Sequence, residues 1–246
     1  MKNRLEYKYL LSLNIIDQLR NDLLRYMEYD EYASRKPRKG YTVRSIYLDS
    51  YDFKCYYEKL DGILMRNKFR VRGYDTKAEN KNIFFEIKRK HDGFISKERF
   101  PVPVNDFQKT WSIRDYTGYE NSEAEAAFTN FSYYYHLRNL DPKVLVIYDR
   151  EPFQCKFGSS LRITFDKALR SKPVSSFGSL FDNEYLTESF TNKFILEVKF
   201  FQVLPQWINS VLNKYDLTRI SVSKYTTSID AHPISSIRLK ETIQSI

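Results

Sequence analysis

Residues 194–200 read FILEVKF, an alternation that leaves apolar side chains on one side of an extended chain and places Glu197 and Lys199 on the other. Successive side chains of a β-strand point to opposite faces of a sheet, so this stretch predicts a strand with one apolar and one charged face. The same period of two recurs at residues 5–11, 42–49, 68–74, 83–90, 94–102, 144–153 and 160–167. These eight segments together predict an α+β, mainly β chain built on antiparallel strands.

Helical spacing is found in fewer places. One apolar stripe with a period of about four residues follows a potential cap at Asn14 and reaches Met27, and a second follows Pro205 and ends at Tyr215. Residues 123–138 give a weaker helical pattern, residues 102–119 fit neither period, and residues 171–191 read as a loop. Because no low-complexity linker interrupts the pattern, residues 1–246 are predicted to form a single domain.

Composition limits the cellular compartments and the classes of partner that fit this chain. A formal charge of +9 on 246 residues favours anionic partners. The two cysteines, Cys55 and Cys155, lie outside any metal-ligand spacing, which favours a reduced compartment over a disulfide scaffold or a zinc site. The longest apolar run, residues 144–148, is far shorter than the roughly 20 residues of a membrane-spanning helix, and no signal-peptide pattern is present. We therefore expect a cytoplasmic protein, associated with a membrane only through a membrane-protein partner that this chain does not encode.

The charged faces of the predicted strands consist almost wholly of Arg, Lys and Glu. With the segment near the C-terminus they carry eleven cations, Arg4, Lys8, Arg70, Arg72, Lys88, Lys97, Arg99, Arg150, Arg162, Lys199 and Lys224, against four carboxylates, Glu6, Glu86, Asp166 and Glu197. On an open sheet such a face simply points to water. In a closed eight-stranded barrel whose apolar outer face is covered by amphipathic helices, it would line the bore. A multiply charged anion would then have to compensate the excess, because buried unpaired charges are costly.

Phosphate chains suit such an array, since arginine binds phosphate oxygens bidentately and lysine acts as a compact point charge. A carboxylate beside a phosphate is repulsive unless a divalent cation lies between them. Glu197, with Glu6 or Glu86, is therefore a candidate ligand of Mg²⁺ or Mn²⁺. The alternative for each glutamate is a salt bridge to a neighbouring Arg or Lys, and for Glu6 and Glu86 both remain open.

A run of basic residues between the first helix and the second strand has two interpretations. Arg35, Lys36, Arg38 and Lys39 are broken by a proline and followed by Gly40, as in a solvated loop. The alternative is an anion-attracting rim at a tunnel mouth.

An ordered set of motifs resembles a known family. RLEYKY at 4–9, VRSIYLDS at 43–50, FRVRGY at 69–74, FFEIKRK at 84–90, SKERF at 96–100, LRITFD at 161–166, FILEVKF at 194–200 and SKYTTSID at 223–230 occur in the order found in the VTC domain. This domain is the polyphosphate polymerase module of vacuolar transporter chaperone complexes, within the triphosphate tunnel metalloenzyme (CYTH-like) superfamily. The resemblance implies an eight-stranded tunnel in which ATP and a growing inorganic polyphosphate chain bind with a divalent metal.

The resemblance also implies roles for individual residues. It places Lys8, Arg70, Arg72, Lys88, Lys97, Arg150, Arg162, Ser223 and Lys224 on the phosphates, with Tyr148 beside them and Glu197 on the metal. Arg4, Arg99 and Lys199 complete the expected substrate-binding set.

The first strand departs from the broader superfamily, which usually carries two alternating glutamates there, because Arg4 replaces the first of them. This exchange favours the polymerase branch, with ATP as donor and polyphosphate, triphosphate or pyrophosphate as acceptor. Two alternatives use the same residues, namely a tripolyphosphatase or nucleoside triphosphatase, and a non-catalytic polyphosphate-binding module. Nucleic acid is not an expected partner, because the aromatic side chains alternate away from the charged face, where bases would have to stack.

Overall fold

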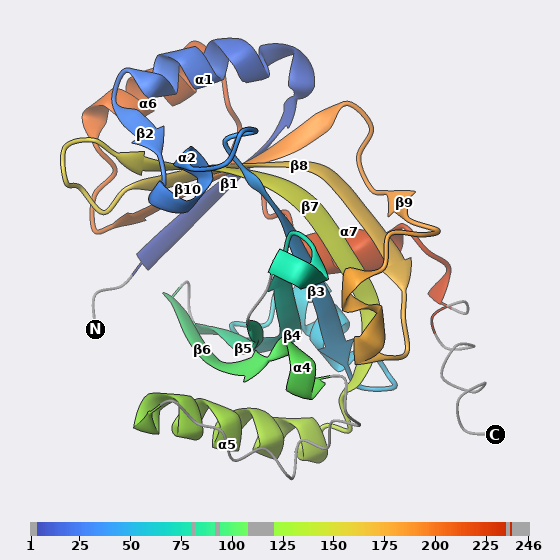
Figure 1. Cartoon of the computed structure of the whole chain (residues 1–246). Helices are drawn as coiled ribbons and strands as arrows, with labels where there is room; N and C mark the ends of the chain where they lie inside the picture. The colour runs from blue at the N-terminus through green and yellow to red at the C-terminus, as the bar shows by residue number, and fades with distance from the viewer. Residues whose placement is uncertain (1–3, 80–81, 92–93, 108–120, 235–236, 238–246) are drawn as a thin grey trace. The chain divides into compact units, whose positions relative to one another are not determined.

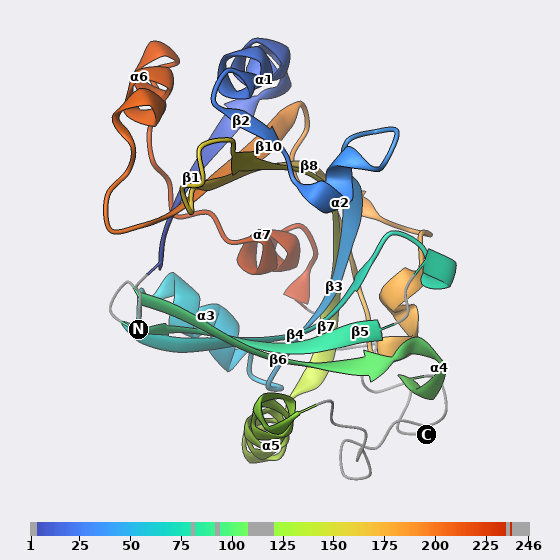
Figure 2. The ribbon, with the colours of Figure 1, turned by 60° about the vertical axis from the view of Figure 1, so that its left-hand side comes forward.

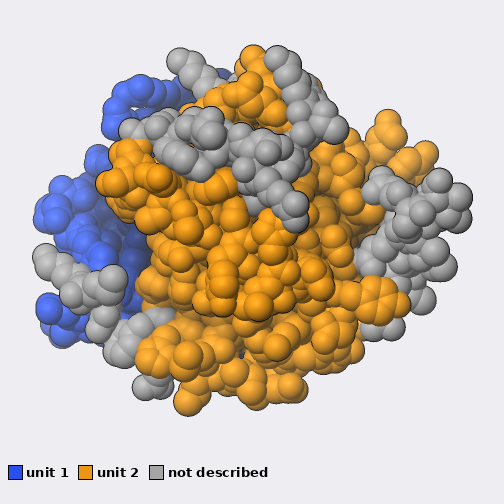
Figure 3. All heavy atoms as spheres, turned by 90° about the horizontal axis from the view of Figure 1, so that it is seen from below, with its two compact units in different colours: residues 1–42, 148–169, 188–223 blue, residues 43–147, 170–187, 224–246 orange. Residues whose placement is uncertain are grey.

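The computed structural model describes residues 4–79, 82–91, 94–107, 121–234 and 237. The chain divides into two compact units, coloured separately in Figure 3. Unit 1 contains residues 1–42, 148–169 and 188–223, and unit 2 contains residues 43–147, 170–187 and 224–246. The single-domain expectation stays a prediction.

Most of the chain's regular structure is β. The strands, labelled in Figure 1, are β1 (Arg4–Ser12), β2 (Met27–Tyr29), β3 (Tyr41–Asp49), β4 (Met65–Tyr74), β5 (Asn82–His91), β6 (Phe94–Pro103), β7 (Asp141–Cys155), β8 (Arg162–Pro173), β9 (Thr187–Glu188) and β10 (Lys193–Phe201). In unit 1 the order of neighbouring strands is β1, β10, β8 and β7, and in unit 2 it is β7, β3, β4, β5 and β6. The pairs β1–β10, β10–β8, β3–β4, β4–β5 and β5–β6 are antiparallel. The predicted mainly β, antiparallel fold class is confirmed.

Helical elements connect the strands. The α-helices are α1 (Ile16–Leu24), α2 (Glu31–Ser34), α3 (Lys54–Leu60), α4 (Val104–Phe107), α5 (Ser122–Leu137), α6 (Gln206–Lys214) and α7 (Lys224–Asp230). The 3₁₀ turns are η1 (Leu13–Ile15), η2 (Lys77–Glu79) and η4 (Phe177–Phe181).

Each of the eight predicted strands is present, whereas several other expectations need correction. Residues 171–191 do not form a plain loop, because they contain the end of β8, η4 and β9. Asn14 is not the helix cap, because it lies within η1, where its amide donates to Ser12 Oγ at 3.3 Å. The first helix ends at Leu24, and Met27 instead begins β2, which pairs with β7. Of residues 102–119, those from 108 onward lie outside the described part of the chain.

The apolar faces of the unit 1 strands are covered by α1 and α6. Leu19 and Leu23 of α1 and Ile208 of α6 join a cluster with the apolar side chains of β8 and β10, including Phe165 and Leu196. Figures 1 and 2 show both helices on the same side of these strands. The expected amphipathic cover is thus present in unit 1, and it leaves the opposite, charged strand faces for other contacts.

In unit 2 the long helix α5 packs on β5 and β6. Phe131 of α5 lies with its ring edge against Phe85 and Phe100, at centroid distances of 5.3 and 5.8 Å. Phe128 contacts Phe100 from the same helix at 5.4 Å. Figures 1 and 2 show α5 next to β6. This aromatic layer fixes the apolar face of the hairpin, so the charged side chains of β4 and β5 occupy its other face.

Candidate functional site

In unit 1 the charged faces of β1, β10 and β8 form rows across the sheet. Lys8 of β1 pairs in register with Glu197 of β10. In the neighbouring row Glu6 pairs with Lys199, which pairs with Arg162 of β8. Residues directly opposite one another on antiparallel strands point to the same face. The register therefore brings these five predicted site residues together.

The carboxylate of Glu197 is surrounded by cations. Its Oε2 lies 2.7 Å from Lys199 Nζ and 3.5 Å from Arg150 Nη2, and its Oε1 lies 3.5 Å from Lys8 Nζ. Lys8 Nζ also lies 3.1 Å from Glu6 Oε1 and so links the two carboxylates. Burial lowers the pKa of the Lys199 ammonium, an effect that Glu197 and Glu6 only partly offset.

Arg150 of β7 is held in a fixed orientation. Its Nε and Nη2 donate to the two oxygens of Asp166 at 2.7 and 2.8 Å, and its guanidinium lies 5.2 Å from the centre of the Tyr148 ring. Burial alone would lower the pKa of Arg150, but Asp166, Tyr148 and Glu197 raise it well above its ordinary value. Gly40 passes close behind, where a Cβ atom would lie only 2.5 Å from the Arg150 carbonyl oxygen. The backbone of β7 is therefore confined at this residue.

Two polar atoms of this region are buried without a protein partner, Arg4 Nε and Thr164 Oγ1. Thr164 pairs in register with Glu197, so its hydroxyl belongs to the same charged face. Burial, and then the positive charge of Arg162, lower the pKa of Arg4. A buried unsatisfied polar group costs about 1–3 kcal/mol. An anion near Arg4 would therefore satisfy a donor and reduce the repulsion between two guanidinium groups.

Unit 2 contains a second set of charged rows. One row crosses β3, β4, β5 and β6 through Tyr47, Arg70, Glu86 and Arg99. The next crosses β4, β5 and β6 through Lys68, Lys88 and Lys97. The predicted phosphate ligands of these strands are thus neighbours.

Glu86 is the centre of the unit 2 cluster and is fully buried, with 0% of its side chain exposed. Its Oε2 accepts from Arg70 Nε at 2.7 Å and lies 2.6 Å from Arg70 Nη2, and its Oε1 accepts from Lys97 Nζ at 2.8 Å. Arg72 Nη1 lies 3.7 Å from Oε2. Burial would raise the pKa of the Glu86 carboxyl, but Arg70, Arg72 and Lys97 hold it well below its usual range. As a metal ligand Glu86 stays a prediction, and these contacts favour its alternative role as a counter-ion.

Two hydroxyl groups of β3 belong to the unit 2 cluster but were not among the predicted site residues. Tyr47 Oη accepts a hydrogen bond from Arg70 Nη1 at 3.2 Å, and Ser45 Oγ accepts one from Arg72 Nε at 3.2 Å. Burial would raise the pKa of Tyr47, but the positive charges of Arg70, Arg72 and Lys224 lower it overall. The alternation of residues 42–49 predicts that Ser45 and Tyr47 share one face of a strand. Only the strand register shows that Ser45 lies opposite Arg72 and Tyr47 opposite Arg70.

The remaining predicted residues take several positions. Lys224, 7% exposed, begins α7 and acts electrostatically on Tyr47. Ser223, 4% exposed, is the residue before Lys224 in the chain and belongs to unit 1. The Arg99 guanidinium lies 4.9 Å from the centre of the Phe84 ring.

Comparisons with known proteins identify the family. A family model described as "VTC domain" matches residues 3–232. This chain belongs to the VTC domain family. The sequence-based resemblance is thereby confirmed, and family membership supports a phosphoryl-handling enzyme of the triphosphate tunnel type.

One solved structure shows a similar fold for this VTC domain, and a second matches it with a lower TM-score. A "putative adenylate cyclase" from Bacillus halodurans has a TM-score of 0.51 at 11% identity, covering 90% of this chain and 94% of its own. A "putative adenylyl cyclase" from Hippeastrum, described as having a dominant triphosphatase activity, has a TM-score of 0.48 at 10% identity, covering 95% and 97%. At this identity the first likeness shows the CYTH-like fold alone. Among curated proteins no match is found.

The donor set of the VTC domain suits a hard divalent cation in unit 1. Proteins of this fold are metal-dependent. Glu197 and Glu6 provide carboxylate oxygens on neighbouring strands, and Thr164 Oγ1 lies buried and unpartnered on the same face. Within the described residues no three His, Cys, Asp or Glu side chains form a metal-binding group. The two carboxylates alone are compatible with a hard cation such as Mg²⁺, which is usually bound by one or two carboxylates together with water and substrate phosphates.

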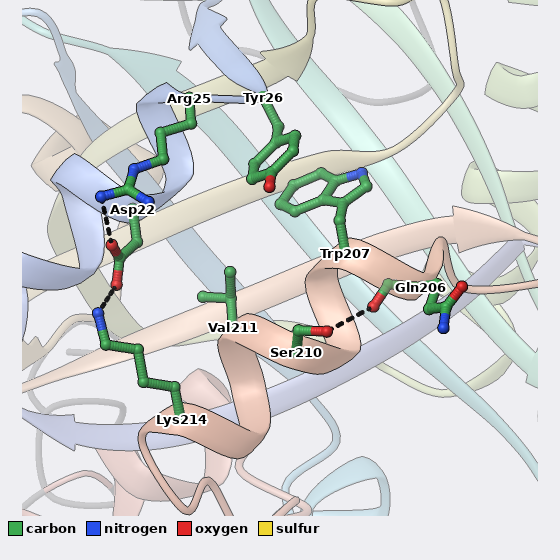
Figure 4. Close-up of a pocket in the computed structure, with 8 residues that line it drawn as sticks. All are labelled: Asp22, Arg25, Tyr26, Gln206, Trp207, Ser210, Val211 and Lys214. Carbon is green, nitrogen blue, oxygen red and sulfur yellow. Dashed lines mark hydrogen bonds and ion pairs between the residues drawn. The ribbon is translucent and has the colours of Figure 1, made fainter.

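A separate groove of about 460 Å³ lies between α1 and α6 in unit 1. Figure 4 shows Asp22 between Arg25 and Lys214, and the Tyr26 ring facing Trp207, with which it stacks at 4.4 Å. The charged side chains of the groove bind one another, so the groove differs in character from the cationic strand face.

The described helices include none that is long and apolar enough to cross a membrane. The cytoplasmic location and the membrane-protein partner stay predictions.

Proposed function

We propose that this VTC domain is a metal-dependent polyphosphate polymerase that transfers the γ-phosphoryl group of ATP to the end of a growing inorganic polyphosphate chain. The observation that carries this proposal is the surroundings of Arg4. Its buried Nε has no acceptor, and its charge is opposed by that of Arg162. A phosphate group would supply an acceptor and a negative charge at once. A carboxylate at residue 4 would instead act as a further metal ligand and would not bind phosphate, as we expect for the hydrolytic branches of the superfamily.

In the proposed reaction an oxygen of the terminal phosphate of the chain attacks the γ-phosphorus of ATP. The bond between that phosphorus and the β–γ bridging oxygen breaks, and ADP leaves. Phosphoryl transfer depends mainly on positioning and on neutralisation of negative charge. Arg150, oriented by Asp166, provides a fixed guanidinium, and Lys8 and Lys199 provide compact charges from neighbouring strands. These groups hold the phosphates without requiring a protein nucleophile.

Glu197 and Glu6 are the proposed metal ligands. Bound there, Mg²⁺ or Mn²⁺ would neutralise charge on the phosphate oxygens. Glu197 keeps Lys8, Lys199 and Arg150 gathered on one face. Removing it would therefore disturb the phosphate ligands as well as the metal.

In unit 2 the proposed phosphate ligands are Arg70, Arg72 and Lys97, which contact Glu86, together with Lys88, Arg99 and Lys224. Tripolyphosphate or pyrophosphate, rather than a single anion, matches such a spread of cations over three strands. The continuous tunnel expected from the family stays a prediction.

A hydrolase is the second candidate, because the same residues would serve if water attacked the γ-phosphorus. Polymerase and hydrolase differ in the acceptor alone, and the product therefore separates them. A non-catalytic module would bind polyphosphate without needing Glu197, and chelation of metal would leave its binding unchanged.

The test is to incubate the purified chain with ATP and Mn²⁺ or Mg²⁺ and to separate the products on a gel that resolves polyphosphate from orthophosphate. A ladder of chains is expected for the wild type, with none for Glu197→Gln. The variant Arg4→Glu should form shorter chains and release more orthophosphate. Orthophosphate alone from the wild type would refute polymerisation in favour of hydrolysis, and intact ATP with metal-independent binding would point to the binding module.

A further inference from the structure

Two reciprocal hydrogen bonds between tyrosine and aspartate hold α7 within unit 2. Tyr225, in the first turn of α7, donates from its hydroxyl to Asp49 Oδ2 at 2.5 Å. Tyr56 of α3 donates to Asp230, the last residue of α7, at 2.6 Å. Both ends of α7 are therefore fastened, one to the end of β3 and the other to α3.

The Asp49 acceptor is rigid. Its side chain belongs to a residue with 0% exposure, and it accepts from the backbone amides of Ser50 at 2.8 Å, Cys55 at 2.8 Å and Tyr56 at 2.9 Å. Because the α3 backbone already satisfies this buried carboxylate, the bond from Tyr225 meets a fixed acceptor in a water-poor environment, where hydrogen bonds are strengthened. The position of the Tyr225 ring thereby follows from the backbone of α3.

The Tyr225 ring in turn meets the cationic cluster. It stacks on Tyr47 at a centroid distance of 5.1 Å and an interplanar angle of 25°. The Tyr47 hydroxyl accepts from Arg70, and Lys224, which precedes Tyr225 in the chain, acts electrostatically on Tyr47. A shift of Tyr225 would therefore move both a lysine and the tyrosine that meets an arginine of the proposed site.

We propose that Asp49 and Tyr225 are positioning residues, which hold Lys224 and Tyr47 at the phosphate-binding cluster of unit 2. This inference rests on the proposed function, because it assigns Lys224 and Arg70 to phosphate groups. The aspartate and the tyrosine themselves do not touch the substrate. Their role is to fix the distance between a cation on α7 and the cations on β4.

The test uses the full chain and measures binding of tripolyphosphate by calorimetry in EDTA, together with thermal unfolding. Tyr225→Phe removes one hydroxyl and keeps the stacked ring, and we expect tripolyphosphate to bind about 10-fold more weakly, the equivalent of one hydrogen bond. Tyr56→Phe is the matched control, since it removes the other hydroxyl of the same helix pair. It should lower the unfolding temperature similarly but weaken binding less than about two-fold.

A double-mutant cycle separates positioning from general destabilisation. In a Lys224→Ala background, Tyr225→Phe should weaken binding by less than about two-fold, because the lysine it positions is gone. Equal losses with and without Lys224, or equal losses for Tyr225→Phe and Tyr56→Phe, would overturn the positioning role. Wild-type chain that fails to bind tripolyphosphate both in EDTA and with Mg²⁺ present would overturn the proposed function and this inference with it. Wild-type binding that Tyr225→Phe leaves unchanged would overturn this inference alone.

Discussion

Replacing Glu86 by glutamine tests the electrostatic balance of unit 2. The substitution keeps the shape of the side chain but removes the charge that faces Arg70, Arg72 and Lys97. Breaking a fully buried ion pair costs about 3–5 kcal/mol, because the partner is left uncompensated. Lys97 is 39% exposed and regains water, whereas Arg70 is only 13% exposed. Because Lys97 regains water, we expect Glu86→Gln to lower the unfolding free energy by roughly 2–3 kcal/mol, less than the loss of a fully buried pair.

Glutamine at this position should have the opposite effect on anion binding. Glu86→Gln removes one negative charge that repels the bound anion. This repulsion is worth roughly 1 kcal/mol after screening, so the variant should bind tripolyphosphate about 5-fold more tightly than the wild type in EDTA. Denaturant unfolding with and without tripolyphosphate, and calorimetric titration, measure the two quantities. The control is Glu98→Gln, whose partner Arg89 is 29% exposed and whose loss should cost under about 1 kcal/mol. Weaker tripolyphosphate binding by Glu86→Gln would refute the counter-ion role of this carboxylate.

Three other outcomes follow from the charged clusters. Glu197→Gln should abolish metal-dependent turnover while leaving part of the phosphate affinity, and full activity in a metal titration would remove Glu197 from the metal site. Arg72→Ala should weaken tripolyphosphate binding by at least about 10-fold, because a charge-assisted hydrogen bond is lost. Lys36→Ala should change turnover by less than about two-fold, because the Lys36 ammonium lies over the Tyr32 ring at 4.8 Å. Because the folded-state pKa of Glu86 lies below its ordinary value of 4.5, its stabilising contribution is present above that pH and is lost on acidification. The difference in unfolding free energy between wild type and Glu86→Gln should therefore shrink below pH 4.5, and a constant difference would contradict the pKa assignment.

The strands could be predicted because their signal is local. FILEVKF and FRVRGY each carry two charged residues separated by one apolar residue, and the backbone alternation alone assigns both to one face. The register between strands is not local. Nothing in the sequence near Lys8 indicates that it stands opposite Glu197, or that Tyr47 stands opposite Arg70. The composition of the clusters was therefore predictable, whereas their internal pairing was not.

Short helices were the other element that the sequence concealed. The segment SKYTTSID has β-branched and hydroxyl residues that favour no helix, yet residues 224–230 form α7 because Tyr225 and Asp230 are bonded to partners far away in the chain. By contrast, α3 begins after Phe53, which has a left-handed φ of 57°, and its first amides donate to side chains a few residues upstream, Lys54 to Ser50 Oγ and Cys55 to Asp49 Oδ1. Long-range contacts thus stabilise α7, whereas side chains just upstream stabilise the start of α3.

The burial of Cys55 at the start of α3 makes the chain's two thiols chemically unequal. Burial, followed by the negative charge of Asp49, raises the pKa of the Cys55 thiol, and the side chain is 2% exposed. For Cys155, burial would raise the thiol pKa, but hydrogen bonds from Ser159 and the nearby backbone lower it overall, and the residue is only partly buried. An alkylating reagent should therefore modify Cys155 first, because the thiolate is the reactive form. Cys55 should react only when α3 opens. Because α3 contributes Tyr56 and holds Asp49, the rate of Cys55 labelling under native conditions should report how often the two tyrosine–aspartate bonds of α7 break.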